Sequence, residues 1–576
     1  MKIGFLVSLI CGLAYFFVFE GINWGIPSSS KIALAMDKSL DNDDFYESLV
    51  KSRNLVYKDS KSHLFASPSY RNDEFKAKER IVVDYRKDGV TFYLANYMRH
   101  YYLCSHDPDE NGVFNGLSNM NPSKFDFNPH YFTYGGGYIY PLAAWYKVLS
   151  WMNIVKLVPD MRYYFRNVDE MGKLYTAGRT LAALMGTLGI LILVLFEYKI
   201  SATFFWPAIL ALLCFTSPII VLWSKFIKPH FYLLPFSMLC VVSSHRFHAT
   251  KNSRYFLWAM FLCGLVAGIA LTTSVLILFP LIVYLRGAFE ARFAIRPAAK
   301  DLAAGFLLFA AGLLLMNPYY ILSPQELHAE ISWVSSALHV SGGMESIYNY
   351  FRYGLGILPS LLFLAAACVG VYFRKTSGAF NLMLLLFILL ISPMVYRLPS
   401  LPGDIRWATF SLPLVFFYTI EIFRRQKGAQ FWLRPLVLAC ALIGIADAAR
   451  FRTYSVNDSK DATSTRIQAG NWMNSATGTA GIGYFYDVIP WTCPPINFSR
   501  HRITVYGNIA ELFSDADRPE YFVLANIHTY ALTKEQLRRL YGLYRIVKVF
   551  QNSQDLLEIP STLVSANSTI YVLKRI

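Results

Sequence analysis

Charged residues are scarce in this sequence. Asp, Glu, Lys and Arg together make up 16% of its 576 residues, whereas 55% of the residues are hydrophobic. A soluble protein of this length usually carries about 25% charged residues. Acidic residues are the scarcer sign, with 38 Asp and Glu against 54 Lys and Arg. This composition excludes an ordinary soluble protein and indicates an integral membrane protein.

Cysteine is also sparse, and its placement excludes a disulfide framework. Six of the eight cysteines stand in apolar runs and are expected to act as small hydrophobic residues: Cys11, Cys214, Cys240, Cys263, Cys368 and Cys440. Cys104 and Cys493 stand in polar segments, and a disulfide between them is left open because sequence alone gives no distance.

Long uncharged runs are abundant, for example "LAALMGTLGILILVLF" at 181–196. Such runs approach the roughly 20 residues that cross a bilayer core. The sequence therefore predicts an all-α polytopic membrane domain of about 11 spans. The expected spans are 4–24, 174–196, 202–222, 231–244, 255–271, 273–286, 301–317, 357–373, 380–395, 407–423 and 435–450.

The net charge of +16 is interpreted through membrane orientation, and we expect no nucleic acid partner. Basic residues collect in cytoplasmic loops, and an N-terminus in the cytoplasm places the clearly basic loops inside. This threading requires a break at 271–274 between two short helices. It also makes 136–152 an interfacial or re-entrant helix. We expect a multi-pass protein of the cell (inner) membrane, with the segment 27–173 and the C-terminal part outside the cytoplasm.

The chain divides into four expected parts. Residues 1–26 form the first span, 27–173 a large first exoplasmic segment, and 174–450 the multi-span domain. Residues 451–576 alternate like strands in "GIGYFYD", "EYFVLAN", "YRIVKVF" and "STIYVLKRI", with Thr533 placed to cap a helix. This last part is predicted to be a small exoplasmic α/β domain.

Negative charge concentrates in one short stretch, "SHDPDE" at 105–110, which holds three carboxylates and a histidine. The plain interpretation is a solvated turn, because Pro108 favours turns and acids are well hydrated. The downstream run "FNPHYFTYGGGYIYPL" (127–142) is rich in aromatic residues and glycine. Such surfaces suit sugar rings and close backbone approach.

Isolated cations stand at the outer ends of the expected spans: Lys225, Lys228, His230, Arg352, Arg397 and Arg406. Each alone is more often an interface residue whose charge reaches toward water. Together they could hold the phosphate of an anionic lipid at the outer leaflet.

These segments resemble the phospholipid-carrier-dependent glycosyltransferases of the GT-C superfamily, which include protein O-mannosyltransferases and the aminoarabinose transferase of lipid A. The resemblance covers most of the chain, in the order of the family. It runs through "HDPDENGVFNGL", "FNPHYFTYGGGYIYPLAAWYKVL", "GRTLAALMGTLGILILVLF", "GLVAGIALTTSVLILFPL", "NPYYILSPQELHAEI" and "RWATFSLPLVFFYTIEI".

The resemblance implies an enzyme that moves a sugar from a polyprenyl phosphate to an acceptor hydroxyl on the outer face. Asp109 would be the catalytic base and Glu110 its helper or an acceptor anchor. Substrate contacts are expected from His106, Asp107, His130, Tyr134, Lys228, His230, Arg397 and Arg406. No cofactor is certain and no metal ligands are assigned, but a divalent cation near Asp109 and Glu110 is left open.

The chemistry fits these residue types. A sugar phosphate has a stable leaving group that needs only positive charge, while the acceptor hydroxyl needs a carboxylate to take its proton. A second carboxylate, Asp107 or Glu110, would raise the pKa of the base by repulsion. A single direct displacement would invert the anomeric centre.

The sequence departs from the family at two places. Residues 25–104 form an insertion longer than is usual, and "KPH" (228–230) replaces an Asp that relatives commonly carry near the start of a span. Neither the donor headgroup nor a metal requirement therefore follows from the resemblance.

Two other functions stay open. The chain could be a transporter or flippase of a lipid-linked substrate, or a non-catalytic GT-C-like assembly protein. Spans almost without internal charge and the lack of a twofold repeat argue against a transporter. The acidic pair argues against a non-catalytic protein. Expected partners are the lipid-linked sugar, an acceptor lipid, glycan or protein, and membrane lipids.

Overall fold

The computed structural model describes residues 2–62, 81–83, 92–290, 295–337, 348–372, 406, 409–426, 428, 430–485, 488–552 and 566–576. The chain forms two compact units. The helical unit comprises Met1–Glu20, Asn115–Trp145 and Gly178–Arg452. The mixed unit comprises Gly21–Phe114, Tyr146–Ala177 and Thr453–Ile576.

Apart from an isolated bridge between Asn121 and Asp126, the secondary structure described in the helical unit consists of helices. They are α1 (Lys2–Ala14), η1 (Tyr15–Phe19), η3 (Pro122–Lys124), α10 (Phe205–Phe215), α11 (Pro218–Trp223), α12 (Pro229–Tyr232), α13 (Leu234–Thr250), α14 (Ser253–Ile269), η4 (Leu271–Ile277), α15 (Leu278–Glu290), α16 (Ile295–Met316), α17 (Tyr319–Leu322), α18 (Pro324–Ala337), η5 (Tyr350–Leu355), α20 (Ile357–Tyr372) and α22 (Leu412–Arg425). The unit boundaries fall inside α6 (Pro108–Asn119), α7 (Gly136–Trp151), α9 (Val168–Ser201) and α23 (Gln430–Asp458).

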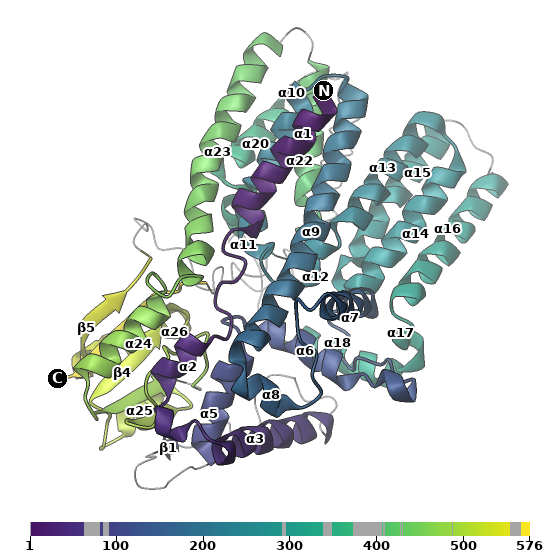
Figure 1. The fold of residues 1–576 in the computed structure, drawn as a ribbon. Helices are drawn as coiled ribbons and strands as arrows, with labels where there is room; N and C mark the ends of the chain where they lie inside the picture. The colour runs from purple at the N-terminus through teal and green to yellow at the C-terminus, as the bar shows by residue number, and fades with distance from the viewer. Residues whose placement is uncertain are drawn as a thin grey trace. The chain divides into compact units, whose positions relative to one another are not determined.

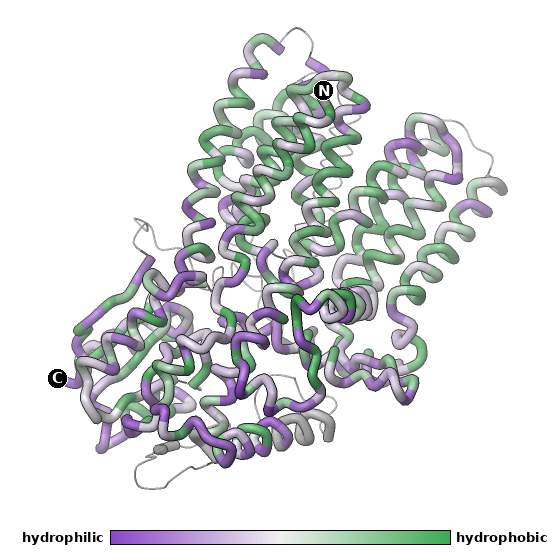
Figure 2. Tube along the Cα trace, in the orientation of Figure 1, coloured by the Kyte–Doolittle hydropathy of each residue, from purple (hydrophilic) through white to green (hydrophobic). Residues whose placement is uncertain are grey.

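Four helical stretches of the described chain are long and apolar enough to cross a membrane: Val168–Ser201, Leu271–Phe289, Ala298–Met316 and Gln430–Asp458. Shorter apolar helices cover Ile3–Phe19, Phe205–Phe215, Ser253–Ile269 and Ile357–Val369. Figure 2 shows apolar residues along the middles of the helices α13 to α16 and polar residues near their ends. A membrane protein is thus supported, whereas the count of about 11 spans stays a prediction. The predicted span 380–395 lies outside the described residues.

The predicted break near residue 271 is present. Helix α14 ends at Ile269, and Ala270 has an extended backbone before the 3-10 turn η4. The Thr273 hydroxyl donates to the carbonyls of Val266 and Ala270, so the break keeps its backbone acceptors satisfied. Helix α7 covers the predicted 136–152 stretch, and its N-terminal end is held where Gly135 N donates to Ile269 O over 2.8 Å.

Helices α14 and α16 pack at very short range because glycines face the partner backbone. A Cβ added to Gly264 would lie 2.1 Å from Phe309 O, and one added to Gly268 would lie 2.5 Å from Met316 Cβ. From the other helix, a Cβ on Gly312 would lie 2.5 Å from Phe261 O. Gly264 and Gly268 are four residues apart, the small-xxx-small spacing that lets membrane helices approach closely. Figure 1 shows the two helices running side by side.

The mixed unit is built around a six-stranded sheet of order β1-β3-β2-β4-β6-β5. Its strands are β1 (Ile81–Val83), β2 (Gly481–Phe485), β3 (Arg502–Tyr506), β4 (Tyr521–Ala525), β5 (Tyr544–Phe550) and β6 (Ile570–Arg575). Strands β3, β2 and β4 are parallel, and the outer strands join them antiparallel. Its helices are α2 (Ser29–Ala35), η2 (Lys38–Leu40), α3 (Asp43–Ser62), α5 (Phe92–Leu103), α8 (Met161–Arg166), α24 (Thr465–Ala476), α25 (Ile509–Ser514), α26 (Asn526–Ala531) and α27 (Lys534–Leu543).

Alternation along the strands sends successive side chains to two different cores. Tyr484 and Val505 belong to a core shared with α2, α3, α5 and α24, whereas Phe485 and Tyr506 belong to a core shared with α25 and α27. The first core includes many residues from 29–103, so the insertion between the first helix and the acidic stretch covers one face of the C-terminal sheet.

The strands predicted from alternation are present as β2, β4, β5 and β6. Thr533 caps α27: its hydroxyl accepts from Gln536 N, while the Gln536 side chain accepts from Thr533 N. Among the described residues no disulfide joins Cys104 and Cys493, which are both buried.

We expect Gly264→Ala to destabilise the helical unit. The added methyl must displace the Phe309 carbonyl, and overpacking of this kind costs about 1–3 kcal/mol. Gly12→Ala in α1 is the matched control, because a Cβ there meets nothing within 4 Å and alanine favours a helix by about 1 kcal/mol. The midpoint temperature of thermal unfolding, measured on the detergent-solubilised protein, should fall for Gly264→Ala only. Equal midpoints for both would contradict the close α14–α16 packing.

Candidate functional site

The acidic stretch forms a tight turn that ends as the start of α6; we call residues Ser105–Glu110 the acidic turn. Asp107 Oδ1 accepts from Asp109 N (3.1 Å) and Glu110 N (3.3 Å), so Asp107 caps the helix. Ser105 Oγ donates to Glu110 Oε2 over 2.5 Å and accepts from Asp107 N over 3.1 Å. Hydrogen bonds of its own polar side chains thus contribute to the shape of the turn.

The three carboxylates of the acidic turn differ in access to solvent. Glu110 is 0% exposed and Asp107 is 3% exposed, whereas Asp109 is partly exposed. Asp107 and Glu110 are committed to holding the turn. Asp109 is the one of these three residues that is partly exposed.

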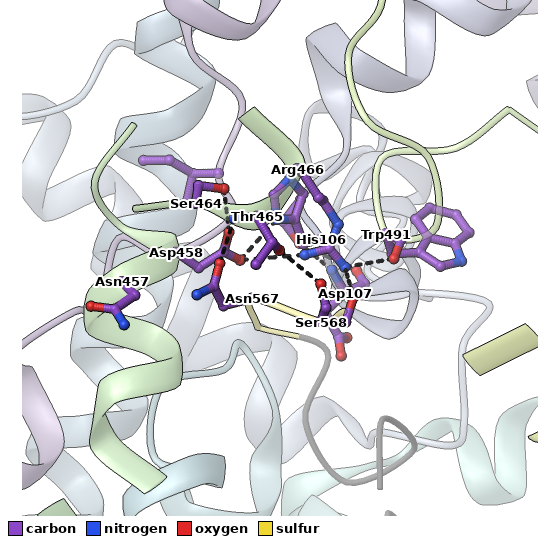
Figure 3. A network of polar contacts seen from close by, with 12 residues as sticks. His106, Asp107, Asn457, Asp458, Ser464, Thr465, Arg466, Trp491, Asn567 and Ser568 are labelled. Carbon is purple, nitrogen blue, oxygen red and sulfur yellow. Dashed lines mark hydrogen bonds and ion pairs between the residues drawn. The ribbon is translucent and has the colours of Figure 1, made fainter. Parts of the chain in front are cut away.

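His106 lies in a buried polar network, which Figure 3 shows from close by. Its Nδ1 lies 2.9 Å from Asp458 Oδ2, 352 residues along the chain. Asp458 also accepts from Ser464 Oγ over 2.8 Å, and Arg466 Nη1 lies 3.6 Å from it. Arg466 Nη2 in turn donates to Trp491 O and Ser568 Oγ.

Burial lowers the pKa of His106 to about 3, with the nearby Lys31 charge acting in the same direction and Asp458 opposing it. The imidazole is therefore neutral near pH 7. Because an ionised carboxylate only accepts, a neutral His106 carries its proton on Nδ1 and donates it to Asp458.

In the helical unit, two predicted cations share one indole ring; we call Trp223, Lys228 and Arg406 the cation–indole cluster. Lys228 Nζ lies 4.8 Å and Arg406 Cζ 5.3 Å from the Trp223 ring centroid. Lys228 is 2% exposed and also lies 4.9 Å from the Phe226 ring. Trp223 Nε1 and the neighbouring Ser224 Oγ are buried and have no hydrogen-bond partner among the described residues.

Two further predicted residues of the helical unit contact each other. The rings of Tyr134 and His230 meet edge to face with centroids 5.9 Å apart, and both side chains are buried. His230 belongs to α12, directly after Lys228 and Pro229. Tyr134 directly precedes the glycines at 135–137, so this contact places the start of the glycine run beside the segment that carries Lys228.

The aromatic loop before α7 is held by carboxylates of α18. His130 Nδ1 lies 2.8 Å from Glu326 Oε2, and Asn128 Nδ2 lies 3.3 Å from the same oxygen. Glu330 accepts from Phe132 N over 2.6 Å and from the backbone and hydroxyl of Thr133. Burial raises the pKa of Glu330, which these hydrogen bonds oppose.

The predicted residues thus fall into two groups. His106, Asp107, Asp109 and Glu110 belong to the mixed unit, and His130, Tyr134, Lys228, His230 and Arg406 to the helical unit. Arg397 lies outside the described residues.

Sequence reasoning missed four partners of these residues: Trp223, Glu326, Glu330 and Asp458. Glu326 and Glu330 stand four residues apart, one helical turn, which could have shown that they share a face. Nothing in the sequence points from Asp458 to His106.

Within the described parts of the chain, no group of three or more His, Cys, Asp or Glu side chains is arranged to hold a metal ion. Glu110 Oε2 accepts a hydrogen bond from Ser105 Oγ. A divalent cation near Asp109 and Glu110 stays a prediction.

No protein-family model and no curated protein matches the sequence. Among solved structures, the chain is similar to the oligosaccharyltransferase of Archaeoglobus fulgidus in a complex with Zn and sulfate, at 13% sequence identity and a TM-score of 0.34. The similarity covers 72% of this chain and 63% of the oligosaccharyltransferase chain. This chain therefore spans less than two thirds of the length of the oligosaccharyltransferase.

The buried neutral His106 predicts loss of stability in acid. Its pKa of about 3 in the fold lies below the roughly 6.5 of an unfolded histidine. Below pH 6.5 the unfolded chain therefore binds a proton that the fold does not. Stability should fall by about 1.4 kcal/mol per pH unit from 6.5 toward 3. When the free energy of unfolding is measured with denaturant between pH 7 and 5, it should depend less steeply on pH in His106→Gln than in the unmodified protein. Parallel curves would contradict the assignment.

Proposed function

We propose that this chain is a membrane glycosyltransferase that moves a sugar from a polyprenyl-phosphate donor to an acceptor hydroxyl on the exoplasmic face. The proposal joins the sequence resemblance to two local arrangements, the acidic turn and the cation–indole cluster. It assigns proton removal to the first and the donor phosphate to the second.

The cation–indole cluster is the observation that carries the proposal. Lys228 and Arg406 come from distant parts of the sequence and lie over the same buried ring. Two cations beside one aromatic ring suit an anionic ligand with several acceptor oxygens. The buried Trp223 N–H and Ser224 hydroxyl also call for an acceptor, since buried donors are almost always satisfied. A phosphate supplies both the charge and the acceptor oxygens.

Asp109 is the proposed base because it combines access with a fixed backbone. Its amide donates to Asp107 in the first turn of α6, so the side chain starts from a defined position. Glu110 is less suited to proton transfer, because its carboxylate is buried and bound to Ser105. Glu110 then serves to shape the turn.

The reaction follows from these roles. Asp109 takes the proton of the acceptor hydroxyl as that oxygen attacks the anomeric carbon. The bond between this carbon and the phosphate oxygen breaks, and its electron pair leaves with the polyprenyl phosphate. Lys228 and Arg406 stabilise the charge of the departing phosphate. One displacement of this kind inverts the anomeric configuration.

The direct test is incubation of the purified protein with a panel of radiolabelled polyprenyl-phosphate sugars. Transfer, or hydrolysis of one donor, supports the enzyme. Donor movement across a vesicle bilayer without covalent change would support a flippase. Binding of a lipid phosphate without either would favour a non-catalytic protein.

We expect Asp109→Asn to abolish transfer, because the amide cannot accept the proton, while membrane insertion and donor binding persist. Asp517→Asn is the matched control: Asp517 is a carboxylate of the same unit that pairs with Arg502 over 2.7 Å. The readout is single-turnover transfer with the best donor of the panel. Full activity of Asp109→Asn would remove the base assignment.

We expect Arg406→Gln to weaken donor use by about 10- to 100-fold, since a hydrogen bond to a charged group contributes about 1.5–3 kcal/mol. The change should appear as a higher donor KM and a lower kcat. Arg434→Gln is the control, because Arg434 also lies over an aromatic ring, that of Phe205 at 5.5 Å. Equal effects of the two variants would argue against a phosphate at the cluster.

A further inference from the structure

Asp458, the last residue of α23, binds the acidic turn from outside. Its side chain is fully buried, and its Oδ2 lies 2.9 Å from His106 Nδ1. The other oxygen accepts from Ser464 Oγ over 2.8 Å. Asp458 thus joins the residue next to the cap of α6 to the segment that leads into α24.

The segment on the far side of Asp458 is itself bonded to the sheet. Thr465 N donates to Asn567 Oδ1 over 2.7 Å, and Thr465 Oγ1 donates to Ser568 O over 2.7 Å. Arg466 reaches Ser568 Oγ over 2.9 Å. Residues 567 and 568 directly precede β6, so the network runs from the C-terminal sheet to His106 (Figure 3).

His106 transmits this constraint because both its imidazole and its backbone make hydrogen bonds. His106 N donates to Gly25 O over 2.8 Å. Gly25 has φ +60°, and a Cβ there would lie 2.6 Å from His106 Cβ, so the glycine lets the backbone of residue 25 pass close to His106. A side chain held in this way leaves Asp107, the helix cap, little freedom to shift.

We propose that Asp458 is a positioning residue for Asp109: by holding His106, it fixes the acidic turn in the register that presents the Asp109 carboxylate. The C-terminal α/β layer is therefore part of the catalytic apparatus and not only an acceptor module or cover. This inference rests on the proposed function for its kinetic consequence, but its structural part can be measured without any substrate.

The location of the Asp458 carboxylate indicates that it positions the acidic turn and does not serve only to stabilise the fold. Ser464 and Arg466 already surround Asp458 within its own segment. The bond to His106 is the one that reaches the acidic turn, and burying a carboxylate, even with Arg466 beside it, is an expensive way to gain only stability. Buried ionic groups are best attested where they specify one arrangement among several.

The test compares Asp458→Asn and Ser464→Ala with Asp37→Asn. Asn is isosteric and removes the charge; Ser464→Ala removes one bond to Asp458 and is the milder variant if the first folds poorly. Asp37 is the matched control, since it accepts from Asn497, Ser499 and Arg500 within the same unit. Amide hydrogen exchange of residues 109–116 and steady-state kinetics with the best donor are measured for each.

We expect exchange at the start of α6 to rise about tenfold in Asp458→Asn and less in Ser464→Ala, with no change in Asp37→Asn. We expect kcat to fall about tenfold in Asp458→Asn while the donor KM stays constant, because the phosphate site is untouched. Unchanged exchange at α6 would overturn the positioning role. Equal loss of kcat in Asp37→Asn would also overturn it, by showing a general stability effect.

The two failures are distinguishable. If Asp109→Asn keeps full activity, the proposed function fails, whereas raised α6 exchange in Asp458→Asn would still support the coupling. If Asp109→Asn is inactive and Asp458→Asn keeps normal kcat, the function stands and the positioning role fails.

Discussion

The contact between His106 and Asp458 is the constraint on which the mixed unit depends. It joins residues 352 positions apart and is completely buried. A carboxylate in such a place is stable only with its partners complete, because removing one leaves an uncompensated buried charge. The contact therefore needs both the acidic turn and the end of α23 in place, and Ser464 joins it to the segment that bonds to Asn567.

This constraint explains why two glycines follow the first helix. Gly21 has φ +73° and would place a Cβ 2.7 Å from Val456 N, while Gly25 has φ +60° and would place a Cβ 2.6 Å from His106 Cβ. Both backbone conformations suit glycine and strain other residues. The chain leaving the first helix can thus lie against both α23 and the acidic turn. The residues that follow add helices to one face of the sheet.

Local patterns made the mixed unit partly predictable. Strict alternation identified β2, β4, β5 and β6, and the threonine before "KEQ" identified the capping box of α27. Strands β1 and β3 escaped notice, since β1 is only three residues long and its partner lies more than 400 residues away. The assignment of α2, α3 and α5 to the sheet could not be predicted either, because it depends on tertiary packing and not on periodicity.

The candidate site follows the same division between local and distant information. Aromatic and cationic side chains were recognisable by type, and the structure brings Lys228 and Arg406 to one indole. Trp223 could not be recognised from the sequence as their shared contact, because a Trp in an apolar run is ordinarily a core residue. Likewise the three carboxylates of the acidic turn look equivalent in sequence. Their roles separate only through the hydrogen bonds of Ser105 and the cap at Asp107.

The long insertion at 25–104 then has a physical interpretation. An acidic turn of six residues cannot bury enough apolar surface to fix its own geometry. The insertion supplies helices to the core beneath the sheet, and that sheet carries the segment that binds Asp458. The added length and the C-terminal layer form one folded body whose polar network ends at His106. The segment 25–104 is thereby linked to the placement of the proposed base through the packing of its helices.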